Sequence, residues 1–283
     1  MRSFIVDCFA EDRYQGNQLL AVVEDREVSD GEQQRIAREI NFSETAFIRP
    51  DRRENGGYDV RIWTPHEELP FAGHPTLGAA YVIRRYLGAS GDTIMLNLKV
   101  GQIPVAVHGG LLVMRQRPPV FGGTVDRNEI AAVFGLPADA IREDFPIQWV
   151  STGLEAVIVP LKDRAALAGI RMDRQAFEAY VSRHPGNHCN HLFFTGTGER
   201  TLAARCMMED LLEDPATGSA NGCLAGYVLE HGWFGASDAA YTVIQGEDMG
   251  RRSVLHIRAA KEADAWTIEV GGRCHTVAEG DWK

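Results

Sequence analysis

An internal repeat restricts the folds open to this chain more than any other feature of its sequence. A shift of about 145 residues aligns two segments half a chain apart. The coinciding positions are Pro70 with Pro215, Gly73 with Gly218, and Ala80 with Ala225. Each copy follows a strand-like run that carries one arginine, and each continues into an apolar helix that ends near a glycine. A strand–loop–helix unit repeated in this way predicts two related halves.

The length of 283 residues also favours two domains, since single domains are usually shorter. Pro118 and Pro119, followed by Gly122 and Gly123, have the composition of a linker. We therefore predict an N-terminal half over residues 1–118 and a C-terminal half over 119–283. The last strand is allowed to cross back to the first half.

Most of the chain consists of short β-type runs, of which Tyr58–Trp63 alternates most regularly. Three amphipathic helices are predicted at 30–39, with Asp30 as its cap, at 126–134 and at 173–182. The two repeated helices, at 76–87 and 220–230, carry so little polar surface that they should be buried. The prediction is an α+β fold of two pseudo-symmetric domains, each with strands around one central helix.

The composition of the chain limits the kinds of molecule that it is expected to bind. With 29 basic and 39 acidic residues, the net charge of −10 gives no electrostatic basis for binding nucleic acid or an anionic membrane. The five cysteines are scattered without a CxxC pair, which is typical of reduced thiols in the cytoplasm. Neither a signal peptide nor an apolar stretch of membrane-spanning length is recognisable. A cytoplasmic protein that binds a small molecule is expected.

The starts of the two repeated helices are the first candidate site. Gly73-His74-Pro75 and Gly218-Ser219-Ala220 present free backbone N–H groups at positive helix ends, which bind carboxylate or phosphate well. If the two starts face each other across a cleft, His74 and Ser219 lie on opposite walls of one pocket. The alternative for Ser219 is that it only caps its helix.

Two carboxylates complete the set. Glu44 begins a β-favouring run, where a buried carboxylate has a raised pKa and can shuttle a proton. Alternatively, Glu44 is only a charged, solvent-exposed residue at the edge of a strand. Asp214 precedes Pro215, and an Asp-Pro pair is by itself an ordinary turn signal.

Five motifs together resemble those of the PhzF-like family, which includes the phenazine-biosynthesis isomerase. They run in order along nearly the whole chain: Gly16-Asn17, Asn41-Phe-Ser43-Glu44-Thr-Ala-Phe, Glu68-Leu-Pro-Phe-Ala-Gly73-His74-Pro-Thr-Leu-Gly, Asp214-Pro-Ala-Thr-Gly218-Ser219-Ala, and Gln245-Gly-Glu-Asp-Met-Gly-Arg-Arg-Ser253. The resemblance implies the two-domain diaminopimelate epimerase fold, with a strongly curved, mostly antiparallel sheet around a central helix in each domain. It also implies a homodimer.

The resemblance further implies isomerisation without a cofactor, by proton transfer on a small cyclic or amino-acid-like carboxylate. Glu44 matches the glutamate that moves the proton in the phenazine isomerase. The other matching catalytic positions are His74, Asp214 and Ser219, and the matching substrate-binding positions are Gly73, Gly218, Asn17 and Ser43. Two departures, Gln18 after Asn17 and Asn221 where alanine is more usual, bear on the substrate rather than on the base.

Three alternatives remain open. A two-base epimerase of the same fold is one, although the helix starts carry Gly73 and Ser219 instead of paired cysteines, and Cys223 reads as a core residue. A metal site in the His-rich segment 184–191 is a second, but it lacks a partner cluster, and we predict no metal. The third is a non-enzymatic binding protein, since a fold alone does not prove activity.

Overall fold

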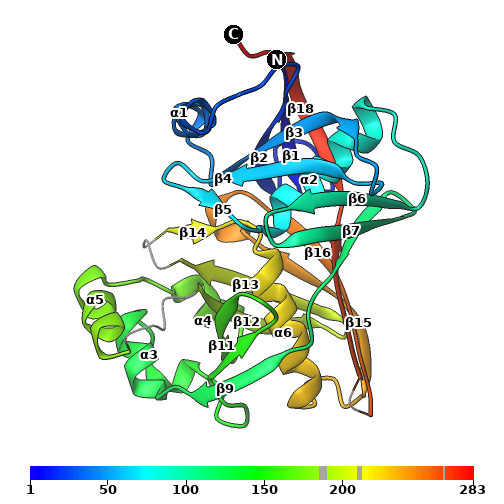
Figure 1. Cartoon of the computed structure of the whole chain (residues 1–283). Helices are drawn as coiled ribbons and strands as arrows, with labels where there is room; N and C mark the ends of the chain where they lie inside the picture. Colours follow the sequence, from blue (N-terminus) through cyan, green and yellow to red (C-terminus); the bar gives the residue numbers. More distant parts are fainter. Residues whose placement is uncertain (185–189, 209–211, 264) are drawn as a thin grey trace. The chain divides into compact units, whose positions relative to one another are not determined.

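The computed structural model describes residues 1–184, 190–208, 212–263 and 265–283. Backbone contacts divide the chain into two compact units (Figure 1). Unit 1 comprises Met1–Arg115 with Gly271–Lys283, and unit 2 comprises Gln116–Val270. The α+β class is confirmed, since both units are dominated by strands and each contains a long helix.

The C-terminal residues return to the first unit. Strand β18 (Cys274–Asp281) pairs antiparallel with β1 (Arg2–Cys8), so the last residues belong to unit 1. The linker expected around Gly122 and Gly123 is instead part of strand β9 (Val120–Thr124). A Cβ atom on Gly122 would lie 2.9 Å from the Cβ of Trp149, so glycine lets β9 approach its neighbour.

Unit 1 is a mixed sheet with one helical crossover before its long helix. Strands β2 and β3 are parallel, because helix α1 carries the chain back between them, and β4 and β6 are also parallel. The remaining strand pairs within the unit are antiparallel. Its other elements are β2 (Asn17–Val23), α1 (Asp30–Ile40), β3 (Glu44–Arg52), β4 (Tyr58–Trp63), β5 (Glu68–Leu69), α2 (Gly73–Tyr86), β6 (Thr93–Leu98), β7 (Gly101–His108) and β8 (Leu111–Arg115).

Unit 2 repeats this order of elements. Strands β11 and β12 are parallel across a helical crossover, and β13 and β15 are parallel across the long helix α6. Its elements after β9 are α3 (Arg127–Val133), η1 (Ala138–Ala140), β10 (Gln148–Ser151), β11 (Glu155–Pro160), α4 (Arg164–Gly169), α5 (Arg174–Arg183), β12 (Asn190–Gly198), β13 (Thr201–Met207), β14 (Glu213–Asp214), α6 (Gly218–Glu230), β15 (Asp238–Gln245), η2 (Glu247–Met249), β16 (Ser253–Glu262) and β17 (Ala265–Gly272). The sequence repeat is therefore a repeat of topology.

The two long helices are buried as their composition predicts. Helix α2 packs against β1, β2, β3 and β6, and α6 packs against β10, β11, β12 and β16. Glycines allow this close approach: a Cβ on Gly78 would lie 2.3 Å from Cδ2 of Leu19, and one on Gly222 would lie 2.9 Å from Cγ of Gln116. Both helices begin earlier than predicted, at Gly73 and Gly218, and neither has a side-chain cap.

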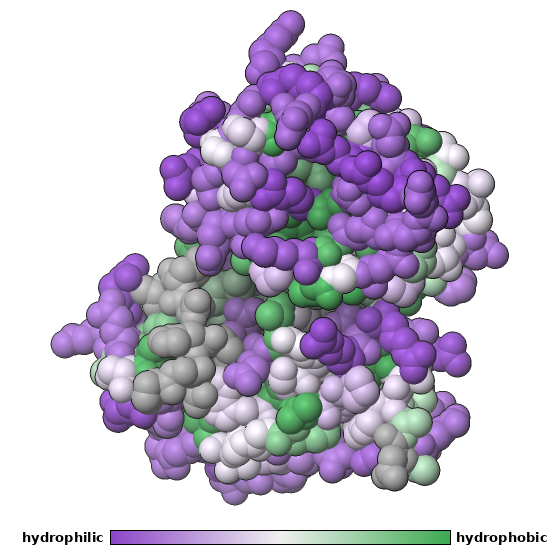
Figure 2. Space-filling model, viewed as in Figure 1, coloured by the Kyte–Doolittle hydropathy of each residue, from purple (hydrophilic) through white to green (hydrophobic). Residues whose placement is uncertain are grey.

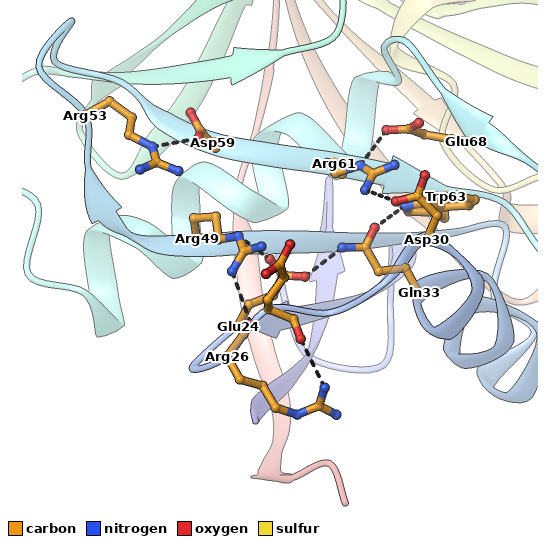
Figure 3. A network of polar contacts seen from close by, with 11 residues as sticks. Glu24, Arg26, Asp30, Gln33, Arg49, Arg53, Asp59, Arg61, Trp63 and Glu68 are labelled. Atoms are coloured by element: carbon orange, nitrogen blue, oxygen red, sulfur yellow. Dashed lines mark hydrogen bonds and ion pairs between the residues drawn. The ribbon is translucent and has the colours of Figure 1, made fainter.

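The amphipathic helices follow their sequence signals closely. Helices α3 and α5 are capped by Asp126 and Asp173, whose carboxylates accept from backbone N–H groups in the first turn. Helix α1 is capped by Ser29 and not by Asp30, because the Ser29 hydroxyl accepts from the N–H of Glu32. The Asp30 carboxylate instead forms an ion pair with Arg61, at 2.7 Å (Figure 3).

The same kind of ion pair occurs within each of the two units. In unit 1, Arg61 of β4 binds Glu68 of β5, with an Nε–Oε1 distance of 2.8 Å (Figure 3). In unit 2, Arg205 of β13 binds Glu213 of β14 through two hydrogen bonds of 2.9 and 2.6 Å. Both pairs anchor the short strand that leads into the long helix. The arginine in each copy of the repeat thus binds the short strand that precedes the long helix.

Figure 2 shows one face of the molecule, on which hydrophilic side chains cover most of the upper part and paler or hydrophobic side chains are interspersed over the lower part. Within the parts of the chain that the structure describes, no helix is both long and apolar enough to span a membrane.

Candidate active site

Glu44 lies at the first position of β3, where the turn after α1 delivers it. Helix α1 ends at Ile40, and its C-cap residue Asn41 adopts the left-handed conformation. Glu44 then pairs in parallel register with Leu19 of β2. Its side chain is only 17% exposed, and its Oε2 atom is buried without a hydrogen-bond partner among the described residues.

This burial changes the acidity of Glu44. Removal from water disfavours the charged carboxylate and raises the pKa of Glu44 to about 7, although a hydrogen bond with Ser43 opposes the shift. A carboxyl group with a pKa near the ambient pH can both accept and release a proton. Burial thus places the pKa of Glu44 close to neutral.

His74 is the neighbour of Glu44. It occupies the second position of α2, and its Nε2 atom lies 3.5 Å from Oε2 of Glu44. The imidazole is 5% exposed, so both groups are withdrawn from water. Pro75 follows in the first turn, where the missing N–H costs no helical hydrogen bond.

Two further predicted residues lie beside this pair. Asn17 begins β2 and is buried, and its Oδ1 lies 3.5 Å from the hydroxyl oxygen of Ser43. Gly73 begins α2, where the first N–H groups have no carbonyl partner within the helix. Unit 1 thus brings together Asn17, Ser43, Glu44, Gly73 and His74.

Unit 2 brings together the remaining predicted residues at the start of α6. Asp214 ends β14, and Gly218 and Ser219 are the first two helical residues. Ser219 does not cap α6, because the cap position is occupied by Thr217. Ser219 therefore occupies the position in α6 that His74 occupies in α2.

Sequence reasoning missed the contacts that hold Asp214. The Thr217 hydroxyl donates to Oδ2 of Asp214, and the buried amide of Gln245 donates to the Asp214 carbonyl at 2.8 Å. Gln245 belongs to one of the quoted motifs, but its distance in sequence from Asp214 concealed the contact. The repeat contains a signal: Thr217 aligns with Ala72, so a hydroxyl is gained in one copy only.

The cysteine and histidine side chains considered above for epimerase or metal chemistry contact other residues of the protein. Cys223 is buried in α6, which raises the pKa of its thiol to about 11 and keeps it protonated near neutral pH. His184 lies 3.0 Å from Glu129, and His191 lies 3.3 Å from the hydroxyl of Tyr180. His188 and Cys189 lie outside the described residues. Among the described residues, no group of three or more metal-binding side chains is assembled.

The family follows from the sequence and the fold together. The model of the family of phenazine biosynthesis-like proteins, PhzC-PhzF, matches residues 6–280, and the chain belongs to this family. Its relatives along the whole chain are isomerases by name, and the chain is a PhzF-family isomerase.

Two relatives illustrate the match. The trans-2,3-dihydro-3-hydroxyanthranilate isomerase of Pseudomonas aeruginosa is 33% identical over 290 residues, which cover 99% of this chain and 98% of that protein. An uncharacterized isomerase of Mesorhizobium japonicum is 31% identical over 297 residues, which cover 98% and 96%.

Several solved structures share the fold. A predicted epimerase of Pseudomonas aeruginosa superposes with a TM-score of 0.82 at 28% identity, covering 99% of this chain and 98% of that one. A phenazine biosynthesis protein of the PhzF family from Bacillus anthracis has a TM-score of 0.89 at 24% identity, with the same coverage. A hydroxyproline epimerase from Agrobacterium vitis, at 9% identity, shares the fold alone, with a TM-score of 0.63 and coverage of 99% and 91%.

Proposed function

We propose that this isomerase moves a carbon-bound proton on a small dihydroaromatic carboxylic acid, without a cofactor, and that Glu44 is the acid–base group. The Glu44 carboxylate takes a proton from an sp3 carbon, and the electron pair of the broken C–H bond passes into the adjacent double bond. The protonated Glu44 then delivers the same proton to a second carbon. One group serves both steps, so the proton is transferred on one face of the ring.

The buried Oε2 of Glu44, which has no hydrogen-bond partner among the described residues, carries this proposal together with a pKa of about 7. Elsewhere in unit 1, Glu24 is also buried and its pKa is also raised. Glu24, however, accepts from Gln33 at 2.6 Å and pairs with Arg49 at 2.8 Å (Figure 3). Glu24 is a structural carboxylate, whereas Glu44 keeps an oxygen available for chemistry.

The other site residues bind and orient the substrate in this proposal. His74 and Asp214 contact its polar substituents, and the N–H groups of Gly73 and Gly218 bind its carboxylate. Ser219, Asn17 and Ser43 complete the polar surface around it. The surrounding arrangement, a strongly curved sheet about a central helix in each unit, belongs to the same proposal.

A pair of matched variants tests the role of Glu44. Glu44→Gln should abolish turnover of trans-2,3-dihydro-3-hydroxyanthranilate, because the amide cannot accept the proton, while ligand binding and folding persist. Glu24→Gln should lower stability and leave turnover within about twofold of wild type, because Glu24 lies in a structural network. Turnover is followed by the change in ultraviolet absorbance of the diene.

Isotope incorporation provides the second measurement. In D2O, wild-type enzyme should place deuterium at the accepting carbon whenever the Glu44 proton exchanges with solvent before its return. Normal turnover by Glu44→Gln would disprove the mechanism. Absence of both turnover and exchange with cyclohexadiene and amino-acid carboxylates would favour a binding protein.

A two-base epimerase is the second candidate, favoured by the solved relative described as a predicted epimerase at 28% identity. It would use Glu44 and Asp214 as opposed acid–base groups. Deuterium would then enter at the carbon that lost its proton, with inversion, and the position of the label separates the two reactions.

Assembly and location are part of the same proposal. We expect a homodimer in the cytoplasm, acting on a small carboxylate and not on nucleic acid or membranes. Sedimentation equilibrium at micromolar concentration measures the oligomeric state, and a monomer at all concentrations would refute the dimer.

A further inference from the structure

A hollow in the surface of unit 1 lies between the second half of α2 and strand β18 (Figure 1). We propose that it is a further binding site, which takes a small aromatic acid through a single carboxylate group. The volume of the hollow is about 470 Å³, within the range of about 300–1,000 Å³ that is usual for ligand pockets. Arg13, Tyr81, Arg85, Tyr86 and residues 275–279 line it. We refer to it as the α2–β18 pocket.

The α2–β18 pocket is separate from the candidate active site. His74 is the second residue of α2, whereas Arg85 is the last but one. The stretch of helix between these two residues corresponds to about 17 Å along its axis. A small acid therefore cannot contact His74 and Arg85 at the same time.

Two arginines supply the positive charge of the pocket. Arg13 donates through Nε to the carbonyl of Thr276 at 3.0 Å, and it forms no ion pair among the described residues. Arg85 lies over the ring of Tyr86, with its Cζ atom 5.6 Å from the ring centre, and it also forms no ion pair in the described part of the chain. Both side chains are exposed. Their remaining N–H groups are therefore available to bind an anion.

Arg84, the neighbour of Arg85, has a structural contact instead. It donates to the carbonyl of Gly91 at 2.5 Å and so ties the loop after α2 to the helix. Arg84 does not line the pocket. Both arginines lie in the last turn of α2, where they more than offset the partial charge of roughly −0.5 at the end of a helix. The end of α2 therefore does not repel an anion bound by Arg85.

Three hydroxyl groups in the pocket leave one proton for a ligand. The hydroxyls of Tyr86 and Tyr81 are each hydrogen-bonded to Oγ1 of Thr276, at 2.8 and 3.2 Å. These two bonds use two of the three hydroxyl protons, and none of the three groups donates to anything else among the described residues. One O–H group therefore remains to donate to an acceptor in the pocket. Together with the arginines, it provides the donors that an anion requires.

His275 contributes a polar atom that the described residues leave unsatisfied. Its Nε2 is buried and has no hydrogen-bond partner among them, a state that is rare in native proteins. His275 lines the α2–β18 pocket and also an adjoining hollow of about 400 Å³, which shares Arg13 with it. When Nε2 carries the proton, a carboxylate oxygen beside His275 supplies the missing acceptor.

The charges of the lining residues favour a single carboxylate over a phosphate group. Arg13 and Arg85 contribute two positive charges and Glu279 contributes one negative charge, so the formal net charge of the pocket is +1 with His275 neutral. A monoanion balances this charge. A phosphate dianion would leave excess negative charge beside Glu279.

The aromatic character of the proposed ligand follows from the tyrosines. Three of the seven tyrosines of the chain, Tyr14, Tyr81 and Tyr86, line the α2–β18 pocket or the adjoining hollow. Tyr14 is 70% exposed, so its ring is open to contact from outside. Aromatic side chains make favourable offset or edge contacts with a flat ring. The pocket therefore suits an aromatic acid better than an aliphatic one.

NMR titration with benzoate tests the site, because backbone amide signals report which residues a ligand contacts. In wild-type protein, benzoate should shift the amide signals of Arg13 and Thr276. Benzamide, which has the same shape without the charge, should shift them far less. Acetate, which lacks the ring, and inorganic phosphate should both bind more weakly than benzoate.

Three variants assign the binding to the charges of the pocket. Arg85→Gln should weaken benzoate roughly tenfold, because it removes a charged donor. Arg84→Gln, the matched control on the same turn of α2, should leave the affinity for benzoate unchanged. Glu279→Gln should raise that affinity by up to about fivefold, since it removes an exposed negative charge, and it should raise the affinity for phosphate by more. All three side chains lie on the surface, so the variants should fold as wild type does.

Several results would overturn the proposal. They are the absence of benzoate-induced shifts at Arg13 and Thr276, equal affinity of wild type and Arg85→Gln for benzoate, and binding of benzamide or phosphate as tight as that of benzoate. Benzoate bound in the candidate active site would instead shift the signals of Ser43 and His74, and those shifts should persist in Arg85→Gln. The outcome does not depend on the proposed function, because Glu44→Gln should leave binding in the α2–β18 pocket unchanged.

Discussion

At the scale of single residues, Glu44 and Glu24 differ in whether their carboxylate oxygens are hydrogen-bonded within the protein. Both are carboxylates of unit 1 with raised pKa values, and the side chain of Glu24 is 3% exposed and that of Glu44 17%. Glu24 is satisfied by Gln33 and Arg49, so its burial is compensated. Oε2 of Glu44 has no hydrogen-bond partner among the described residues, so ionisation of Glu44 costs folding free energy.

That cost predicts a pH-dependent gain in stability for Glu44→Gln. The folded-state pKa of about 7 lies above the ordinary value of 4.5, so wild-type stability falls as pH rises between these values. The shift corresponds to roughly 3 kcal/mol. In urea unfolding, Glu44→Gln should be more stable than wild type by up to about that amount at pH 8 and show no gain at pH 4.

The comparison of the two pH values supplies the control. An equal change in the free energy of unfolding at pH 4 and at pH 8 would show that ionisation of Glu44 does not destabilise the folded protein.

The type and approximate position of the acid were predictable from sequence, because a glutamate before a β-type run was visible. The size of its pKa shift was not predictable, since that depends on how completely the folded protein buries the carboxyl group.

At the scale of elements, helix α2 depends on glycine where it meets the sheet. A Cβ on Gly78 would lie 2.3 Å from Leu19 and 2.8 Å from the sulfur of Cys8. The sequence predicted an apolar helix over 76–87, whereas α2 begins at Gly73. The true start puts His74 within the first turn.

Gly78→Ala should therefore destabilise the protein by about 1–3 kcal/mol, since the added methyl group overpacks the contact. Gly31 of α1 is the matched control: a Cβ added there would lie 3.7 Å from its nearest neighbour, an atom of the Arg35 side chain. Gly31→Ala should be neutral or stabilising by up to about 1 kcal/mol. Urea midpoints of both variants measure the difference, and similar midpoints would contradict the close packing of α2.

At the scale of the whole molecule, unit 1 is discontinuous in sequence. Strand β18 pairs with β1 along its length, and the backbone N–H of Ala10 donates to the carbonyl of Arg273 at 3.1 Å. The two chain ends meet, because the N–H of Trp282 donates to the Met1 carbonyl at 2.8 Å. The first half of the chain therefore lacks one strand of its own sheet.

A fragment of residues 1–115 should accordingly fail to unfold cooperatively. A rearranged fragment, with residues 271–283 joined through a short glycine linker to the front of residues 1–115, should unfold with a single transition. Urea unfolding monitored by circular dichroism compares the two. Cooperative unfolding of residues 1–115 alone would show that β18 is dispensable.

The sequence by itself determined the α+β class, the repeated strand–loop–helix unit, the apolar character of α2 and α6, and the family, because each of these is recorded in local patterns and ordered motifs. Tertiary structure alone decided that the pKa of Glu44 lies near 7, the hydrogen bonds from Thr217 and Gln245 to Asp214, and the register in which β18 pairs with β1. These properties depend on burial and pairing between residues far apart in the chain, and such contacts leave no periodic trace in a single sequence.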